Sequence, residues 1–135
     1  HFAQAERLHR IAILQPMRDS LIGNVLENVP DTRLTGLPTL RMPNHASFVF
    51  ENVDGNALLT LLDVEGFACS SGSACKTGNP EPCEVLIAMG ISRSWALGSL
   101  RVTLGLHTTS EQVERFVQIL PGVVERIRRT RQHQQ

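Results

Sequence analysis

The stretch HASFVFENV, residues 45–53, carries the clearest structural signal in this chain of 135 residues. Ala46, Phe48 and Phe50 occupy every second position, so a strand over this stretch has one wholly apolar face. The intervening positions mix polar and apolar side chains, a pattern that suits an antiparallel sheet with one face packed against a core. Asp54–Gly55 then ends the strand.

Periodic segments on both sides of this strand predict a succession of helices and short strands. Upstream, apolar residues at three-and-four spacing indicate an amphipathic helix over residues 3–25, in which Pro16 predicts a kink or a restart near Gln15. Downstream, the same kind of spacing predicts helices over residues 57–64, from Pro82 to about residue 89, and from residue 109 onward. Short strands are expected at Thr32–Leu34, Phe67–Ser70 and Leu100–Leu104.

The last predicted helix begins at a capping box, formed by Thr109 and Gln112. Pro121–Gly122 is expected to interrupt this helix, and the polar tail from Arg128 to Gln135 is expected to fray. The chain has too few parallel crossover units for a doubly wound sheet. We therefore predict an α+β domain with a small antiparallel or mixed sheet.

Composition restricts the kind of protein that this chain forms. With 135 residues and 41% hydrophobic side chains, residues 1–135 suffice for one compact domain. The 13 Lys and Arg balance the 13 Asp and Glu, so no general attraction to nucleic acid or to anionic membranes is expected. The longest apolar stretches, such as Ala57–Leu62, are too short to cross a bilayer. Because the chain starts with His1 rather than Met, we interpret it as a piece of a longer protein.

The three cysteines, Cys69, Cys75 and Cys83, do not form the usual pattern of a disulfide or zinc framework. The chain shows no secretion signal, so reduced thiols and a cytoplasmic location are predicted. The gaps of five and seven residues between the cysteines lack the paired short spacing of common zinc sites, even with His45 or His107 added, and no metal site is predicted. Cys69 is expected to be a small core residue, and Cys83 has no evident role.

Cys75 lies in a polar loop that we expect over residues 70–82, within CSSGSACKTGNPEP. Small neighbours leave its sulfur accessible, and the glycines allow the loop to move, as a thiol nucleophile requires. The adjacent Lys76 favours the thiolate, although only weakly. Taken alone, these residues are compatible both with a nucleophile and with an inert loop cysteine.

Arg101 occupies the polar side of the last predicted strand, with no acidic residue close in sequence. A guanidinium offers two parallel donors to a carboxylate, so Arg101 is either a carboxylate-binding residue or a solvated strand arginine. His45 and His107 flank strands, and we interpret both as structural histidines rather than as bases.

These motifs, in this order and spacing, resemble the C-terminal region of group I cysteine desulfurases, within the class V pyridoxal-phosphate aminotransferase family. The resemblance rests on SSGSAC (70–75), Glu81–Pro82, SLRVTLG (99–105) and Thr108–Thr109, and it extends to MPN (42–44) and Asp54–Gly55. It covers nearly the whole chain. It implies the small C-terminal domain of a fold-type I pyridoxal-phosphate enzyme, with helices packed on one face of the sheet.

The resemblance also implies roles for both candidate residues. Cys75 would attack the sulfur of L-cysteine, become a persulfide and release L-alanine, while Arg101 would hold the substrate carboxylate. The loop would then deliver the sulfur to an acceptor or scaffold protein, such as an iron–sulfur cluster assembly system. Full-length members of the family are homodimers.

The family's large domain, which binds pyridoxal phosphate, has no counterpart in this sequence. Lys76 is the only lysine and does not match the Schiff-base motif. We therefore expect no cofactor-binding residue here and no desulfurase activity from this chain alone. The alternatives are a free-standing persulfide carrier or interaction module, and a piece of an enzyme resembling selenocysteine lyase.

Overall fold

The computed structural model of this protein describes residues 2–35, 44–67, 69, 74–76, 79–81, 84–105 and 107–133. In chain order, its helices and strands are α1 (Phe2–Asn28), β1 (Thr32–Leu34), β2 (His45–Phe50), α2 (Gly55–Val64), β3 (Ala74–Lys76), β4 (Asn79–Glu81), α3 (Glu84–Ala88), α4 (Arg93–Ala96), β5 (Ser99–Thr103) and α5 (Ser110–His133).

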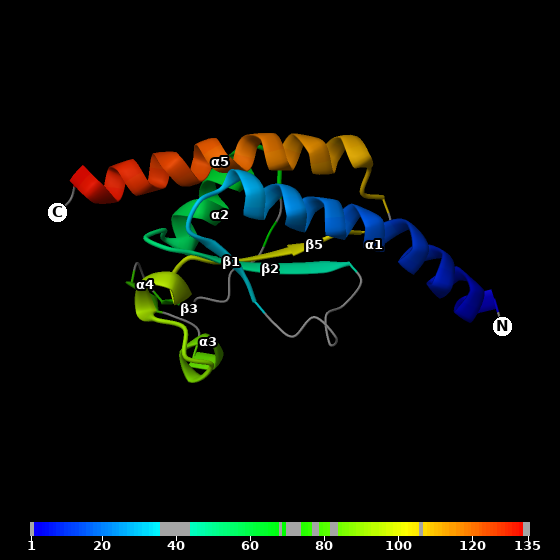
Figure 1. The fold of residues 1–135 in the computed structure, drawn as a ribbon, viewed down its shortest axis with the longest axis horizontal. Helices are drawn as coiled ribbons and strands as arrows, with labels where there is room; N and C mark the ends of the chain where they lie inside the picture. The colour runs from blue at the N-terminus through cyan, green and yellow to red at the C-terminus, as the bar shows by residue number, and fades with distance from the viewer. Residues whose placement is uncertain are drawn as a thin grey trace.

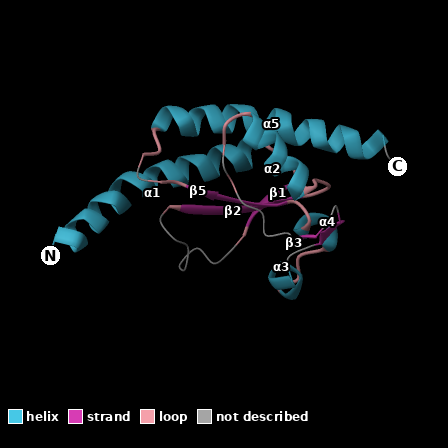
Figure 2. Cartoon of the chain, turned by 180° about the vertical axis from the view of Figure 1, so that it is seen from behind, coloured by secondary structure: helices cyan, strands magenta, loops and turns pink. Residues whose placement is uncertain are grey.

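A three-stranded antiparallel sheet, ordered β1-β2-β5, forms the base of the domain. The helices α1, α2 and α5 lie together on one face of this sheet, and Figures 1 and 2 show this layer from opposite sides. This arrangement confirms the predicted α+β fold, with the three long helices packed on one face of the sheet. The short helices α3 and α4 follow the hairpin β3–β4, and α4 packs against β2.

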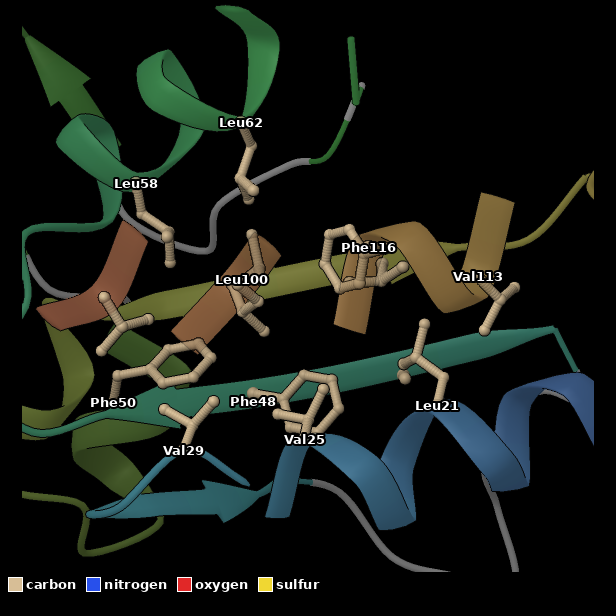
Figure 3. Close-up of a cluster of buried hydrophobic side chains, with 14 of the residues drawn as sticks. Leu21, Val25, Val29, Phe48, Phe50, Leu58, Leu62, Leu100, Val113 and Phe116 are labelled. Carbon is tan, nitrogen blue, oxygen red and sulfur yellow. The ribbon is translucent and has the colours of Figure 1, made fainter. Parts of the chain in front are cut away.

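The main core lies between the sheet and the helical layer. Ala46, Phe48 and Phe50, the alternating apolar residues of β2, are all buried and face the helices. The side chains that meet them come from α1, α2, β5 and α5, as Figure 3 shows, and include Leu21, Val25, Leu58, Leu62, Leu100, Val113 and Phe116. The period-two pattern of residues 45–50 therefore marks the core face correctly.

A second, smaller core lies on the opposite face of β2. Val49 is fully buried there and packs with Leu86, Ala96 and Trp95. This cluster fixes α4 against the sheet, close to where β5 begins. The four-residue helix α4 did not appear in the sequence analysis, because it is too short to show helical periodicity.

Both interior prolines are accommodated within continuous helices. Helix α1 runs through Pro16 without a restart, although its axis changes direction near mid-length in Figure 1, in line with the expected kink. Helix α5 runs through Pro121, so the predicted interruption at Pro121–Gly122 is wrong. Leu120 and Val124 are buried on either side of Pro121, and this packing offsets the backbone hydrogen bond that the proline removes.

The last turns of α5 are tied to the sheet and do not fray where we expected fraying to begin. The guanidinium of Arg128 donates to the carbonyl oxygens of Pro30 (2.9 Å), Asp31 (3.1 Å) and Glu51 (3.0 Å). Burial lowers the pKa of Arg128, and the nearby carboxylates of Asp31 and Glu51 oppose this shift. Arg128 thus links α5 to the turns that precede β1 and follow β2.

The capping box predicted at the start of the last helix is present, and α2 has a cap that was not predicted from the sequence. The N–H of Thr109 donates to Gln112 Oε1 (3.0 Å) and the N–H of Gln112 donates to Thr109 Oγ1 (3.2 Å), which is the expected capping box. Asp54 caps α2 by accepting a hydrogen bond from the N–H of Asn56 (2.9 Å). No helix in the described part of the chain is both long and apolar enough to cross a membrane.

Candidate functional site

The candidate nucleophile Cys75 lies in the middle of β3, opposite Pro80 of β4. We expected residues 70–82 to form a loop, but residues 74–76 and 79–81 pair as an antiparallel hairpin. This hairpin is a sheet of its own and does not join the three-stranded sheet. Pro80 has no N–H group, so the ladder lacks one donor at the position facing Cys75. Strands of three residues that pair only with each other add little stability of their own.

The chain leading toward this hairpin is anchored on α5 through Phe67. Its ring meets the ring of Phe116 edge-on, with 5.3 Å between centroids. The guanidinium of Arg115 lies over the same ring at 5.3 Å and is 3.8 Å from the carboxylate of Glu65. A strand was predicted at Phe67–Ser70, but Phe67 and Cys69 are not in a strand. Its other two residues, Ala68 and Ser70, lie outside the described part of the chain.

Cys69 is a packing residue, as predicted. It is partly buried against the main core and lines a pocket of about 240 Å³ between β5, α1 and α5, together with Phe67 and Arg115. Burial raises the pKa of its thiol to about 11. The thiol therefore stays protonated near neutral pH and is a poor nucleophile there.

Arg101 lies on the face of β5 opposite to α1, α2 and α5, with Ser47 of β2 directly opposite. Its side chain is exposed, and the structure records no hydrogen bond or ion pair from it to another described residue. Just before β5, the backbone at Gly98 lies very close to the backbone of Phe50. A Cβ on Gly98 would be 2.2 Å from the carbonyl oxygen of Phe50. The glycine thus allows β5 to begin tight against the end of β2.

His45 lies next to Arg101 on the same face, paired with Thr103. The hydroxyl oxygen of Thr103 is 3.3 Å from Nε2 and 3.5 Å from Nδ1 of the imidazole. Burial, and secondly the positive charge of Arg101, lowers the pKa of His45 below 6.5. The sequence alone indicates a structural role for His45, and only the strand register places it beside Arg101.

The remaining candidate residues do not join either site. No described contact links Cys75 with Arg101, which belong to separate sheets. His107 is exposed in a turn before α5, and Cys83 lies outside the described residues. Within the described residues, no three His, Cys, Asp or Glu side chains cluster as metal ligands would.

Among the residues that the structure describes, no set fits pyridoxal phosphate, which needs a Schiff-base lysine and donors for its phosphate. The one lysine, Lys76, lies in β3 beside Cys75. In the pocket at Cys69 the cation is Arg115, which is already engaged by Glu65 and by the ring of Phe67. No step of the chemistry proposed below therefore relies on this chain to hold the cofactor.

Comparison with known proteins agrees with the resemblance noted in the sequence. The aminotransferase class-V family model matches residues 8–116. An "IscS-like cysteine desulfurase" of Mycobacterium tuberculosis is 43% identical over 119 residues, which is 87% of this chain and 30% of that protein. "Cysteine desulfurase NifS" of Azotobacter vinelandii is 39% identical over 120 residues, covering 89% of this chain and 30% of that protein. The chain thus spans about 30% of the length of these relatives.

Solved structures show the same fold. A "NIFS-LIKE PROTEIN" superposes with a TM-score of 0.72 at 24% identity, over 90% of this chain and 30% of that one. A NifS-like protein from Rickettsia africae superposes with a TM-score of 0.71 at 23% identity, over 85% of this chain and 29% of that one. The sequence motifs, the fold and the family model agree, and the chain belongs to the aminotransferase class-V family.

Proposed function

We propose that this chain is the sulfur-accepting C-terminal domain of a cysteine desulfurase, with Cys75 as the nucleophile. The observation that carries the proposal is the SSGSAC motif ending at Cys75, in a chain 39–43% identical to cysteine desulfurases. The contrast with Cys69 supports it. Burial suppresses the Cys69 thiolate, whereas Cys75 lies in a short hairpin outside the main sheet.

The proposed reaction transfers one sulfur atom. The thiolate of Cys75 attacks the sulfur of L-cysteine, so that an S–S bond forms as the C–S bond breaks, and the carbon keeps the bonding electron pair and takes up a proton. One thiol and L-cysteine thus become one persulfide and L-alanine, with no external oxidant. Pyridoxal phosphate, held by a separate large domain of a longer protein, would activate that carbon.

Arg101 would hold the carboxylate of the substrate. Its guanidinium is exposed, has no ion-pair partner among the described residues, and lies on a strand fixed by the core through Leu100 and Val102. A fork of two parallel N–H donors matches a carboxylate. Removing it would therefore weaken substrate binding more than it slows the sulfur transfer itself.

The longer protein is proposed to be a homodimer that passes the persulfide sulfur to an acceptor or scaffold protein, such as an iron–sulfur cluster assembly system. A persulfide carrier without desulfurase activity of its own is the second candidate. It is favoured by one observation: the residues that the structure describes form no set that fits pyridoxal phosphate.

A visible spectrum separates these two candidates from a complete enzyme. When pyridoxal phosphate is added to the 135-residue chain, we expect no stable absorbance of a lysine aldimine. We also expect no release of alanine from L-cysteine. A stable aldimine band would contradict the proposal that the cofactor site lies in another domain.

The test of Cys75 uses the longest protein that contains these residues, loaded with pyridoxal phosphate. We expect Cys75→Ser to lower desulfuration by at least about a thousandfold, because it removes the nucleophile. The cofactor spectrum should be unchanged, and mass spectrometry should find no persulfide on the peptide containing residue 75. Cys69→Ser is the matched control and should keep most of the activity. Retained desulfuration in Cys75→Ser would overturn the assignment.

A further inference from the structure

A small polar cluster surrounds Arg101 on the face of the sheet opposite to α1, α2 and α5. On this face, β2 contributes His45 and Ser47, and β5 contributes Arg101 and Thr103. Ser47 is directly opposite Arg101, and His45 is its diagonal neighbour across the two strands. Diagonal neighbours lie roughly 7–8 Å apart at their Cα atoms, within reach of a long side chain.

Arg33, the other arginine that the described strands place on this face, is already engaged. Arg33 of β1 is paired with Val49, and its guanidinium lies 4.4 Å from the centroid of the Trp95 ring. Arg101 has no such stacking partner and no ion pair among the described residues. Of the two arginines, Arg101 is therefore the one whose guanidinium remains available to a ligand.

His45 is the diagonal neighbour of Arg101 and contacts Thr103. Thr103 lies directly across the strand pair, and its hydroxyl contacts the imidazole at 3.3 Å. Arg101 is the charged group that acts electrostatically on the ring, and it lowers the pKa of His45 in the same direction as burial does. On the other side of β2, Thr35 donates to the carbonyl of Ser47 and brings no charge. A neutral ring can lie close to a guanidinium without repelling it.

We propose that His45 is a positioning residue for Arg101: the imidazole, held by Thr103, restricts the guanidinium from one side and keeps it directed toward a substrate carboxylate. The inference rests on the proposed role of Arg101 in binding L-cysteine. It adds a residue that does not belong to the nucleophile hairpin and that acts through Arg101 rather than on the reacting sulfur.

The proximity of Arg101 to His45 predicts that a carboxylate bound at Arg101 changes the pKa of His45, which can be measured on the 135-residue chain. A carboxylate bound at Arg101 offsets the positive charge that lowers the pKa of His45, so binding must raise that pKa. The probe is propionate, compared with sodium chloride at equal ionic strength, and the readout is the NMR titration of the His45 ring. We expect a pKa below 6.5 in chloride, and a rise with propionate that disappears in Arg101→Gln. A rise of equal size in Arg101→Gln, or no rise in the unsubstituted chain, would overturn the inference.

Kinetics on the longer, cofactor-loaded protein provide a second readout. We expect His45→Ala to raise KM for L-cysteine about threefold to tenfold, the effect of one lost polar contact, while kcat stays within about twofold. His45→Asn keeps a polar group for Thr103 and should restore part of the affinity. His107→Asn, a substitution at an exposed turn, is the matched control and should leave KM unchanged.

The outcomes separate this inference from the proposed function. If the Cys75 persulfide forms normally but KM is insensitive to His45→Ala, the positioning role of His45 is wrong and the sulfur transfer stands. If Cys75→Ser still produces alanine, the proposed function is wrong whatever His45 does. A change in kcat with unchanged KM in His45→Ala would also contradict the positioning role.

Discussion

The substitution Arg128→Met tests whether the end of α5 is a structural anchor or a solvated tail. Arg128 donates three hydrogen bonds to backbone carbonyls of Pro30, Asp31 and Glu51, at 2.9, 3.1 and 3.0 Å. Asp31 has a positive φ of 54°, a conformation that few residues other than glycine adopt without support. The same residue accepts a hydrogen bond from the N–H of Glu51 (3.0 Å). Arg128 therefore supports two turns that set the ends of β1 and β2.

The expected loss follows from the number and exposure of these bonds. Each contributes about 1 kcal/mol net, and the partial exposure of the guanidinium keeps the sum near 2–3 kcal/mol. Methionine keeps most of the aliphatic length of arginine, so the loss reports mainly on the hydrogen bonds. The matched control is Arg126→Met, at an exposed position of the same helix, which should change stability by less than about 0.5 kcal/mol.

Urea unfolding at 25 °C, followed by far-UV circular dichroism, measures both variants. Arg128→Met should lower the unfolding midpoint without changing the dependence on urea, because the folded state stays compact. Similar losses in the two variants, or a loss below about 1 kcal/mol in Arg128→Met, would show that the hydrogen bonds to the turns are not the main contribution. The fraying expected from the polar sequence of the tail would then be the better description.

Two further predictions concern close packing and thiol reactivity. Gly98→Ala should destabilise the domain by about 3 kcal/mol or more, because its Cβ would lie 2.2 Å from the backbone oxygen of Phe50. Gly122 lies inside α5, and a Cβ added there would meet nothing within 4 Å. Gly122→Ala should therefore stabilise the domain by about 0.5–1 kcal/mol. Thermal unfolding should rank Gly122→Ala above Gly98→Ala in stability, and the opposite order would contradict this reasoning. At pH 8, iodoacetamide should alkylate native Cys69 roughly 100-fold more slowly than the urea-unfolded chain, because burial raises the pKa from 9.0 to about 11. Because the pKa of Cys69 is higher in the folded state, the contribution of this thiol to stability is complete below pH 9 and is lost as the pH rises to about 11. Equal alkylation rates of Cys69 in the folded and unfolded chain, measured by peptide mass mapping, would show that the thiol is not buried.

The candidate site shows how far the sequence alone could lead. The motifs alone point to Cys75 and Arg101 as candidates, and their roles stay predictions. The hairpin that carries Cys75 was not predicted, because its strands are only three residues long. The nearby Gly78 and Pro80 are also typical of turns and loops. His45 could not be linked to Arg101 from the sequence, since 55 positions separate them and only the antiparallel register makes them neighbours.

The sequence by itself determined which residues face the main core and how the last helix begins. The alternation in residues 45–50 and the capping box at Thr109 are local patterns, and both are present in the structure. Such signals depend on neighbours a few positions apart, so they can be detected along the chain.

Only the tertiary structure decided where helices continue and which distant residues meet. Helix α5 passes through Pro121 because packing of Leu120 and Val124 outweighs the local cost of the proline. Arg128 ends up as an anchor because the carbonyls it binds belong to turns more than seventy positions earlier in the chain. Packing and long-range hydrogen bonds of this kind leave no local signal, since their free energy appears only once the chain has folded.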